Sequence, residues 1–118
     1  MNKWELEFWE SEAGNCPARE FLDKLKQKDS LSHQRVGKKL VRFQSQSLSD
    51  LRKAGELEKV DGELYELRLS VGIEIRFLVK VADVINKLSI VCVSHVIKKK
   101  SNKLRKQDID LAKSRLKI

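Results

Sequence analysis

The sequence predicts an α+β domain in which an N-terminal strand and two antiparallel helices precede an antiparallel meander of three or more strands and a short C-terminal helix. Apolar residues recur at helical spacing in the first half of the chain and near its end, and they alternate along the sequence from residue 64 onward. No internal repeat and no long linker divides the chain. We therefore expect residues 1–118 to form one domain, with helices on one face of the sheet.

The N-terminal half contains the first strand and both long helices. Residues 4–9 (WELEFW) alternate between apolar and charged side chains, which predicts a half-buried strand. A helix is expected from Pro17, since proline is tolerated in a first helical turn, and a second helix is expected to start after Ser30 or Ser32. Residues 48–62 give mixed signals and are expected to run over the surface.

A β-hairpin follows, with apolar residues at the odd positions on both sides of Gly72, from Tyr65 to Val81. Directly paired residues share a face, so the loop must hold an odd number of residues, and a three-residue loop centred on Gly72 satisfies this condition. This register sets Arg68 directly across from Arg76 on the face away from the apolar residues. The buried pairs that it implies are Leu69 with Ile75 and Leu67 with Phe77.

The last elements are a strand and a helix. Residues 88–97 form a nearly continuous apolar run, which predicts an inner strand covered on both faces, and a turn around residues 83–87 precedes it. The basic segment KKKSNKLRK follows. A short amphipathic helix is expected from about Lys106, because apolar residues recur there at spacings of three and four.

Positive charge is concentrated at the C-terminal end. The chain has 25 basic and 17 acidic residues, a net charge of +8. Residues 95–118 hold nine basic and two acidic residues, which gives +7 for this segment and leaves +1 for the rest. A nearly neutral body with a cationic end is typical of a protein that binds a phosphate backbone. A solvated charged helix is the alternative interpretation.

The composition and the motifs argue against several other classes of protein. No apolar run is long enough to span a membrane and the N-terminal segment is charged, so we expect no membrane span and no secretion signal, and a cytoplasmic location. Cys16 and Cys92 are far apart and have no zinc-ligand spacing, so both are expected to be free, buried thiols. Neither a glycine-rich phosphate loop nor an HExxH motif is present, and no metal or cofactor is expected.

The arginine pair admits two interpretations. Like charges directly opposite on neighbouring strands are destabilising by about 0.2–1 kcal/mol, so a counter-anion is expected. Glu66 or Glu74 is one source of that anion, which would make the pair structural. An RNA phosphate is the other, because guanidinium groups bind phosphate through two parallel hydrogen bonds.

Three segments resemble the RelE/HigB toxin superfamily, particularly its phage-derived HigB-like branch. Residues 64–80 (LYELRLSVGIEIRFLVK) are similar to the strand pair of that branch, and residues 95–112 (HVIKKKSNKLRKQDIDLA) are similar to its C-terminal pattern. Residues 4–25 match in the order and spacing of strand, glycine turn and proline-started helix. Val96-Ile97 and Arg105 depart from the glycine-phenylalanine pair and the proline usual in the branch. The resemblance covers nearly the whole chain and implies a RelE-like fold.

The resemblance also implies a function. It implies a toxin of a type II toxin-antitoxin system that cleaves mRNA on the ribosome without a metal ion and forms a hetero-oligomer with a cognate antitoxin, a small DNA-binding protein. Attack of an RNA 2′-OH on its own phosphate requires a base, cations for the phosphate and an acid for the leaving 5′-oxygen. The candidate catalytic residues are Arg68, Arg76, His95 and Lys99, and the candidate RNA-binding residues are Lys98, Lys100, Lys103 and Arg105.

The sequence also allows other interpretations. A ParE-like toxin would act on DNA gyrase, a non-catalytic RNA-binding or regulatory module would need only the basic end, and an inactive toxin would keep only antitoxin binding. His95 is alternatively an ordinary residue at a strand end. Tyr65 is expected in the core because of its odd position, and Trp9, on the polar side of its strand, either contacts a partner or packs at the rim.

Overall fold

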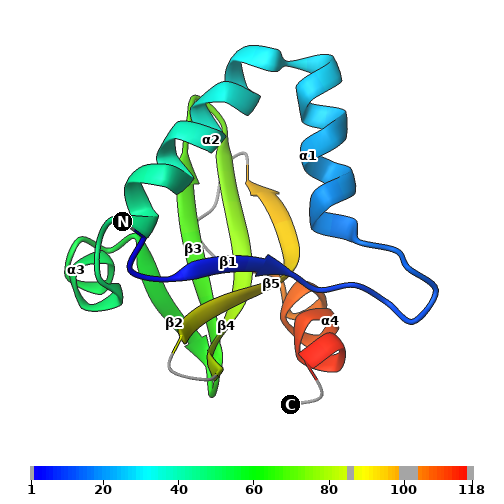
Figure 1. Cartoon of the computed structure of the whole chain (residues 1–118). Coiled ribbons are helices and arrows are strands. Elements are labelled where there is room, and N and C mark those ends of the chain that lie inside the picture. Colours follow the sequence, from blue (N-terminus) through cyan, green and yellow to red (C-terminus); the bar gives the residue numbers. More distant parts are fainter. Residues whose placement is uncertain (1, 85–86, 99–103, 117–118) are drawn as a thin grey trace.

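The structure, a computed structural model, describes residues 2–84, 87–98 and 104–116, with only the backbone described for 82–84 and 87–98. Its α+β class and its order of elements confirm the sequence-based expectation (Figure 1). The helices are α1 (Pro17–Lys28), α2 (Ser30–Gln44), α3 (Leu48–Lys53) and α4 (Lys106–Leu116). The strands are β1 (Glu5–Phe8), β2 (Leu57–Asp61), β3 (Leu64–Ser70), β4 (Glu74–Val84) and β5 (Lys87–Lys98).

The chain turns from α1 into α2 at a single residue, Asp29. Its backbone N–H donates to the carbonyl of Leu25, which ends α1. Its carboxylate accepts hydrogen bonds from the backbone N–H of Ser32 at 3.1 Å and from the Ser32 hydroxyl at 2.6 Å, which caps α2. The same hydrogen bonds lower the pKa of the Asp29 carboxyl. One side chain therefore fixes where α2 begins, within a residue or two of the predicted start.

The five strands form one sheet in the order β1-β5-β4-β3-β2. The β3–β4 hairpin has the predicted register, with Leu69 opposite Ile75 and a loop centred on Gly72, whose φ of +92° is unfavourable for residues with a side chain. β5 is an inner strand, as predicted, because it pairs antiparallel with β4 and parallel with β1. The N-terminal strand thus closes the sheet beside a strand from the other end of the sequence.

Each face of the sheet carries its own apolar cluster. Odd-numbered residues of β3 and β4, from Leu67 to Val79, pack with α1, α2 and α3, and this larger cluster includes Phe43, Leu51 and Phe77, each 0% exposed. On the opposite face Leu64 and Leu78 pack against Ala112 of α4. Next to this cluster, the described side chains of β3 and β4 on the same face include Glu66, Arg68 and Arg76.

Two expectations are wrong. Residues 48–62 do not simply run over the surface: although most of them are exposed or half-buried, they form α3 and β2, and Leu51 and Leu57 are buried at 0% and 2% exposure. The segment is too short to show a clear period, and the burial comes from the larger apolar cluster, which joins Leu51 and Leu57 to residues far away in the sequence such as Trp4. The helices are also not confined to one face, because Ile109, Ala112 and Leu116 of α4 pack on the side of the sheet that α1 and α2 leave open.

Candidate functional site

The site is built on the even-numbered residues of β3 and β4. Arg68 and Arg76 are direct partners in the register, as predicted, and both lie on the sheet face opposite the larger apolar cluster. The one-residue alternation that buries Leu67 and Leu69 among the helices puts Arg68 on the other side. This arginine row lies next to the Leu64–Leu78 cluster under α4, so the C-terminal helix borders the site.

Three carboxylates neutralise the two arginines. Glu66 lies 2.9 Å from Arg68 through Oε1 and 3.9 Å from Nε of Arg76 through Oε2, so it is shared between them. Glu58 of β2 pairs with Arg68 at 2.9 Å, and Glu74 pairs with Arg76 at 2.9 Å. The predicted counter-anions Glu66 and Glu74 are thus present, and Glu58 adds a third. The cluster as described carries two positive and three negative charges.

The two arginines differ in their access to solvent. The side chain of Arg76 is 3% exposed and that of Glu66 is 6% exposed, whereas 28% of the Arg68 side chain is exposed. Nε of Arg76 and Oε2 of Glu66 make no hydrogen bond within the described part of the chain, so their attraction is an ion pair alone. Arg76 is therefore the buried member of the pair, and Arg68 is the more exposed member.

The outer carboxylate of the cluster has a shifted pKa. Hydrogen bonds from the Arg76 side chain and from the Ser70 hydroxyl lower the pKa of Glu74 below its ordinary value of 4.5, and the positive charges of Arg76 and Lys39 act in the same direction. Both hydrogen bonds are 2.9 Å long. Glu74 is therefore ionised at neutral pH and holds the Arg76 guanidinium in place.

A hollow of about 290 Å³ opens beside Arg68. It lies between strands β2 and β3 and the segment that leads into α4, so polar groups of the sheet face apolar groups of the C-terminal segment. Glu66 lines it together with Arg68, while Arg76 does not. The full lining is Glu58, Lys59, Val60, Glu66, Arg68, Leu104 and Ile109.

The basic C-terminal candidates are only partly described. Arg105 precedes α4, has a side chain that is 76% exposed and pairs with Asp108 at 3.4 Å. The backbone of Lys98 pairs with Glu74, and that of His95 pairs with Phe77, while Val96 is the residue opposite Arg76. The remaining candidates, Lys99, Lys100 and Lys103, lie outside the described residues.

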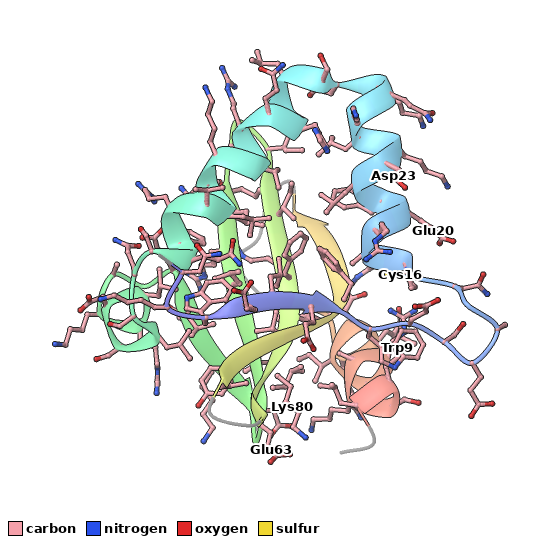
Figure 2. The ribbon with its side chains drawn as sticks, in the orientation of Figure 1. Trp9, Cys16, Glu20, Asp23, Glu63 and Lys80 are labelled. Carbon is pink, nitrogen blue, oxygen red and sulfur yellow. The ribbon has the colours of Figure 1, made fainter. Side chains whose placement is uncertain are left out.

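Tyr65 packs against the larger apolar cluster, as predicted, with the Arg52 guanidinium 5.5 Å from its ring centre. Trp9 packs at the rim beside α4, where the Arg115 guanidinium lies 5.0 Å from its ring centre (Figure 2). Cys16 is a free, buried thiol, as predicted, while the side chain of Cys92 is not described.

Two parts of the site were missed from the sequence. Glu58 belongs to a strand that the sequence did not predict, so nothing indicated that it would meet Arg68. The hollow depends on where α4 packs, which no local pattern specifies. Among the described residues, no three His, Cys, Asp or Glu side chains gather as a metal site would require. No described helix is long and apolar enough to cross a membrane.

The fold is the one that the resemblance to RelE/HigB toxins implies. Residues 20–117 match the family described as phage-derived protein Gp49-like (DUF891), and the chain belongs to this family. The family is one of toxin-antitoxin toxins within the RelE/HigB-like superfamily, which implies a cognate antitoxin. No curated protein and no solved structure matches the chain.

Proposed function

We propose that this toxin is a ribosome-dependent endoribonuclease that cleaves mRNA, and that Arg68 binds the phosphate at the cleaved position. The observation that carries the proposal is Arg68 itself: a guanidinium held by Glu58 and Glu66, partly exposed, at the wall of a hollow of about 290 Å³. A fixed, partly dehydrated guanidinium is suited to bind a phosphate through two hydrogen bonds.

The reaction is an intramolecular transesterification at an RNA phosphate. The 2′-oxygen attacks the neighbouring phosphorus, the bond from phosphorus to the 5′-oxygen breaks, and the products carry a 2′,3′-cyclic phosphate and a 5′-hydroxyl. The proton of the 2′-OH passes to a base and a second proton reaches the leaving oxygen. Because the nucleophile is already adjacent to the phosphorus, we propose that no metal ion takes part. His95 and Lys99 are the proposed proton-transfer groups.

Arg76 has a different role in this proposal. Its side chain is buried behind Glu66 and does not line the hollow, so it supports the site by holding Glu66 and Glu74 in position. The arginine cluster has a net negative charge of its own, and long-range attraction for RNA must therefore come from elsewhere. The basic end of the chain supplies it, with Lys98, Lys100, Lys103 and Arg105 as the proposed RNA contacts.

Mapping of RNA ends on ribosomes tests the proposal. Purified protein is mixed with ribosomes programmed with a defined message, and the 5′ ends that appear are mapped by primer extension. We expect cleavage only when ribosomes are present, and a loss of about 10²–10³ in rate for Arg68→Ala, as for removal of one transition-state contact. Arg52→Ala removes the same charge from α3, on the other sheet face, and should cleave normally. Cleavage of free message, or full activity of Arg68→Ala, would refute the assignment.

The neutralised arginine cluster favours a second candidate function, an RNA-binding module without cleavage. Glu58→Gln separates the two, because it removes the more exposed carboxylate that competes with a phosphate for Arg68. If Arg68 binds phosphate, this variant should bind an oligonucleotide more tightly. If the basic end alone binds RNA, Glu58→Gln should bind the oligonucleotide with the same affinity as the unmodified chain. In that case, no variant should cleave the message. Damage to DNA gyrase complexes with intact message would instead indicate a ParE-like activity.

A further inference from the structure

The outer face of α2 has properties that neither the fold nor the arginine site explains. Two of the three large apolar side chains that are exposed among the described residues lie on this helix, Leu31 at 54% and Val41 at 66%. The inner face of α2 is already used, since Val36 and Phe43 are buried in the larger cluster. Leu31 and Val41 therefore do not contribute to the core of the isolated chain.

A row of cations lies beside these two apolar residues on the same helix. Arg35, Lys38, Lys39 and Arg42 follow one another at spacings of three, one and three, and they line a second hollow of about 290 Å³ together with Ser70 and Val71 of the hairpin. These positions correspond to i, i+3, i+4 and i+7, which share one side of a helix.

Anions balance this row only in part. Glu56 lies 3.2 Å from Arg42 and 4.0 Å from Lys39. Arg35 and Lys38 form no ion pair within the described part of the chain, although Arg35 helps to lower the pKa of Asp29. The outer face of α2 therefore keeps a positive charge.

A glycine lies in the middle of the same helix. Gly37 is exposed, has an ordinary helical backbone, and a Cβ placed on it would meet no atom within 4 Å. Glycine weakens an exposed helix interior relative to alanine, so the fold gains nothing from it. Without a side chain, Gly37 leaves the backbone of α2 open next to Lys38 and Val41.

We propose that the outer face of α2 binds an acidic, amphipathic helix of a protein partner. Leu31 and Val41 are ten residues apart, which corresponds to about 15 Å along the helix, so a partner helix of about ten residues covers both. Aliphatic side chains of the partner would pack on Leu31 and Val41, and its carboxylates would pair with Arg35 and Lys38. RNA would satisfy the cations but would leave both apolar side chains uncovered, so a protein partner is favoured.

The test uses the full chain and a synthetic probe. The probe is a fluorescein-labelled helical 18-residue peptide with leucines at i, i+3, i+4 and i+7 and glutamates beside them. A peptide of the same composition in scrambled order serves as control, and a labelled twelve-residue oligouridine serves as the RNA probe. Fluorescence anisotropy at fixed salt should give saturable binding of the amphipathic peptide, with a dissociation constant below about 100 μM, and much weaker binding of the scrambled peptide.

Three variants locate the binding face. Lys38→Glu and Val41→Asp should each weaken peptide binding at least tenfold, while Lys24→Glu, the same charge reversal on the exposed side of α1, should change it less than twofold. All three sites are exposed, so circular dichroism and thermal melting should match those of the unmodified chain.

The results of these binding experiments distinguish a protein partner from RNA on the outer face of α2. Absence of peptide binding, or equal binding by Lys38→Glu, Val41→Asp and the unmodified chain, would overturn the proposal. So would a tenfold loss of oligouridine binding in Lys38→Glu combined with unchanged peptide binding in Val41→Asp, which would make the face an RNA surface. None of these results depends on cleavage of mRNA.

Discussion

Glu66 should contribute more to stability than any exposed acidic residue of the chain, and Glu66→Gln tests this. Its carboxylate is 6% exposed and lies 2.9 Å from Arg68 and 3.9 Å from Arg76. The amide preserves the shape but leaves the 3% exposed Arg76 without the buried half of its counter-charge. Removal of one partner of a buried pair costs about 3–5 kcal/mol. Because Glu74 still pairs with Arg76, we expect the lower end, about 3 kcal/mol.

Urea unfolding followed by circular dichroism measures the effect, as a lower midpoint with an unchanged slope. Glu63→Gln is the matched control: Glu63 pairs with Lys80 at 3.7 Å and is 63% exposed, and Figure 2 shows both at the edge of the molecule. An exposed pair of this kind contributes roughly 0–1 kcal/mol.

A double-mutant cycle adds a second readout. Glu66→Gln combined with Arg76→Gln should cost clearly less than the two single changes together, because each single variant already removes the attraction between Glu66 and Arg76. Equal losses for Glu66→Gln and Glu63→Gln, or simple additivity in the cycle, would show that the buried ion pair does not form.

Three further predictions follow from the packing and the charges. Leu51→Ala should lower the free energy of unfolding by about 2–5 kcal/mol, since Leu51 is fully buried in α3; a loss below 1 kcal/mol would argue that this helix is not packed on the core. Gly72→Ala should destabilise the chain by roughly 1 kcal/mol because of its positive φ, whereas Gly37→Ala should stabilise it by up to about 1 kcal/mol; urea midpoints that shift in the same direction would contradict this. Glu74 has a lowered pKa, so its stabilising effect is present above pH 4.5 and is lost as the pH falls below that value; melting temperatures of Glu74→Gln should show a weaker fall on acidification, and an identical fall would refute the assignment.

The hairpin could be predicted to the single residue because its information is local. Apolar residues hold the odd-numbered positions on both sides of Gly72, which fixes the residues that share a face. Only a loop with an odd number of residues pairs odd-numbered positions with one another. The pairing of Arg68 with Arg76 follows from the same argument. α3 and β2 could not be predicted in this way, since Leu51 and Leu57 are buried by contacts with residues far along the chain.

Residues of the site could be predicted only where the strands that carry them could be predicted. The arginine pair and two of its carboxylates lie on the predicted hairpin, so the need for a counter-anion could be stated in advance. Glu58 lies on an unpredicted strand, and the hollow exists because α4 packs on Leu64 and Leu78. Both depend on tertiary packing, which a charge pattern along the sequence does not encode.

The two hollows lie on opposite sides of the sheet. Arg68 is on the face that α1 and α2 leave open, whereas Lys38 and Val41 are on the outer side of α2, which covers the other face. A protein helix bound to α2 would therefore leave the hollow beside Arg68 uncovered. Such a partner would inhibit cleavage by adding bulk and negative charge that prevent the toxin from approaching the ribosome, and it would not need to displace the Glu58 and Glu66 ion pairs.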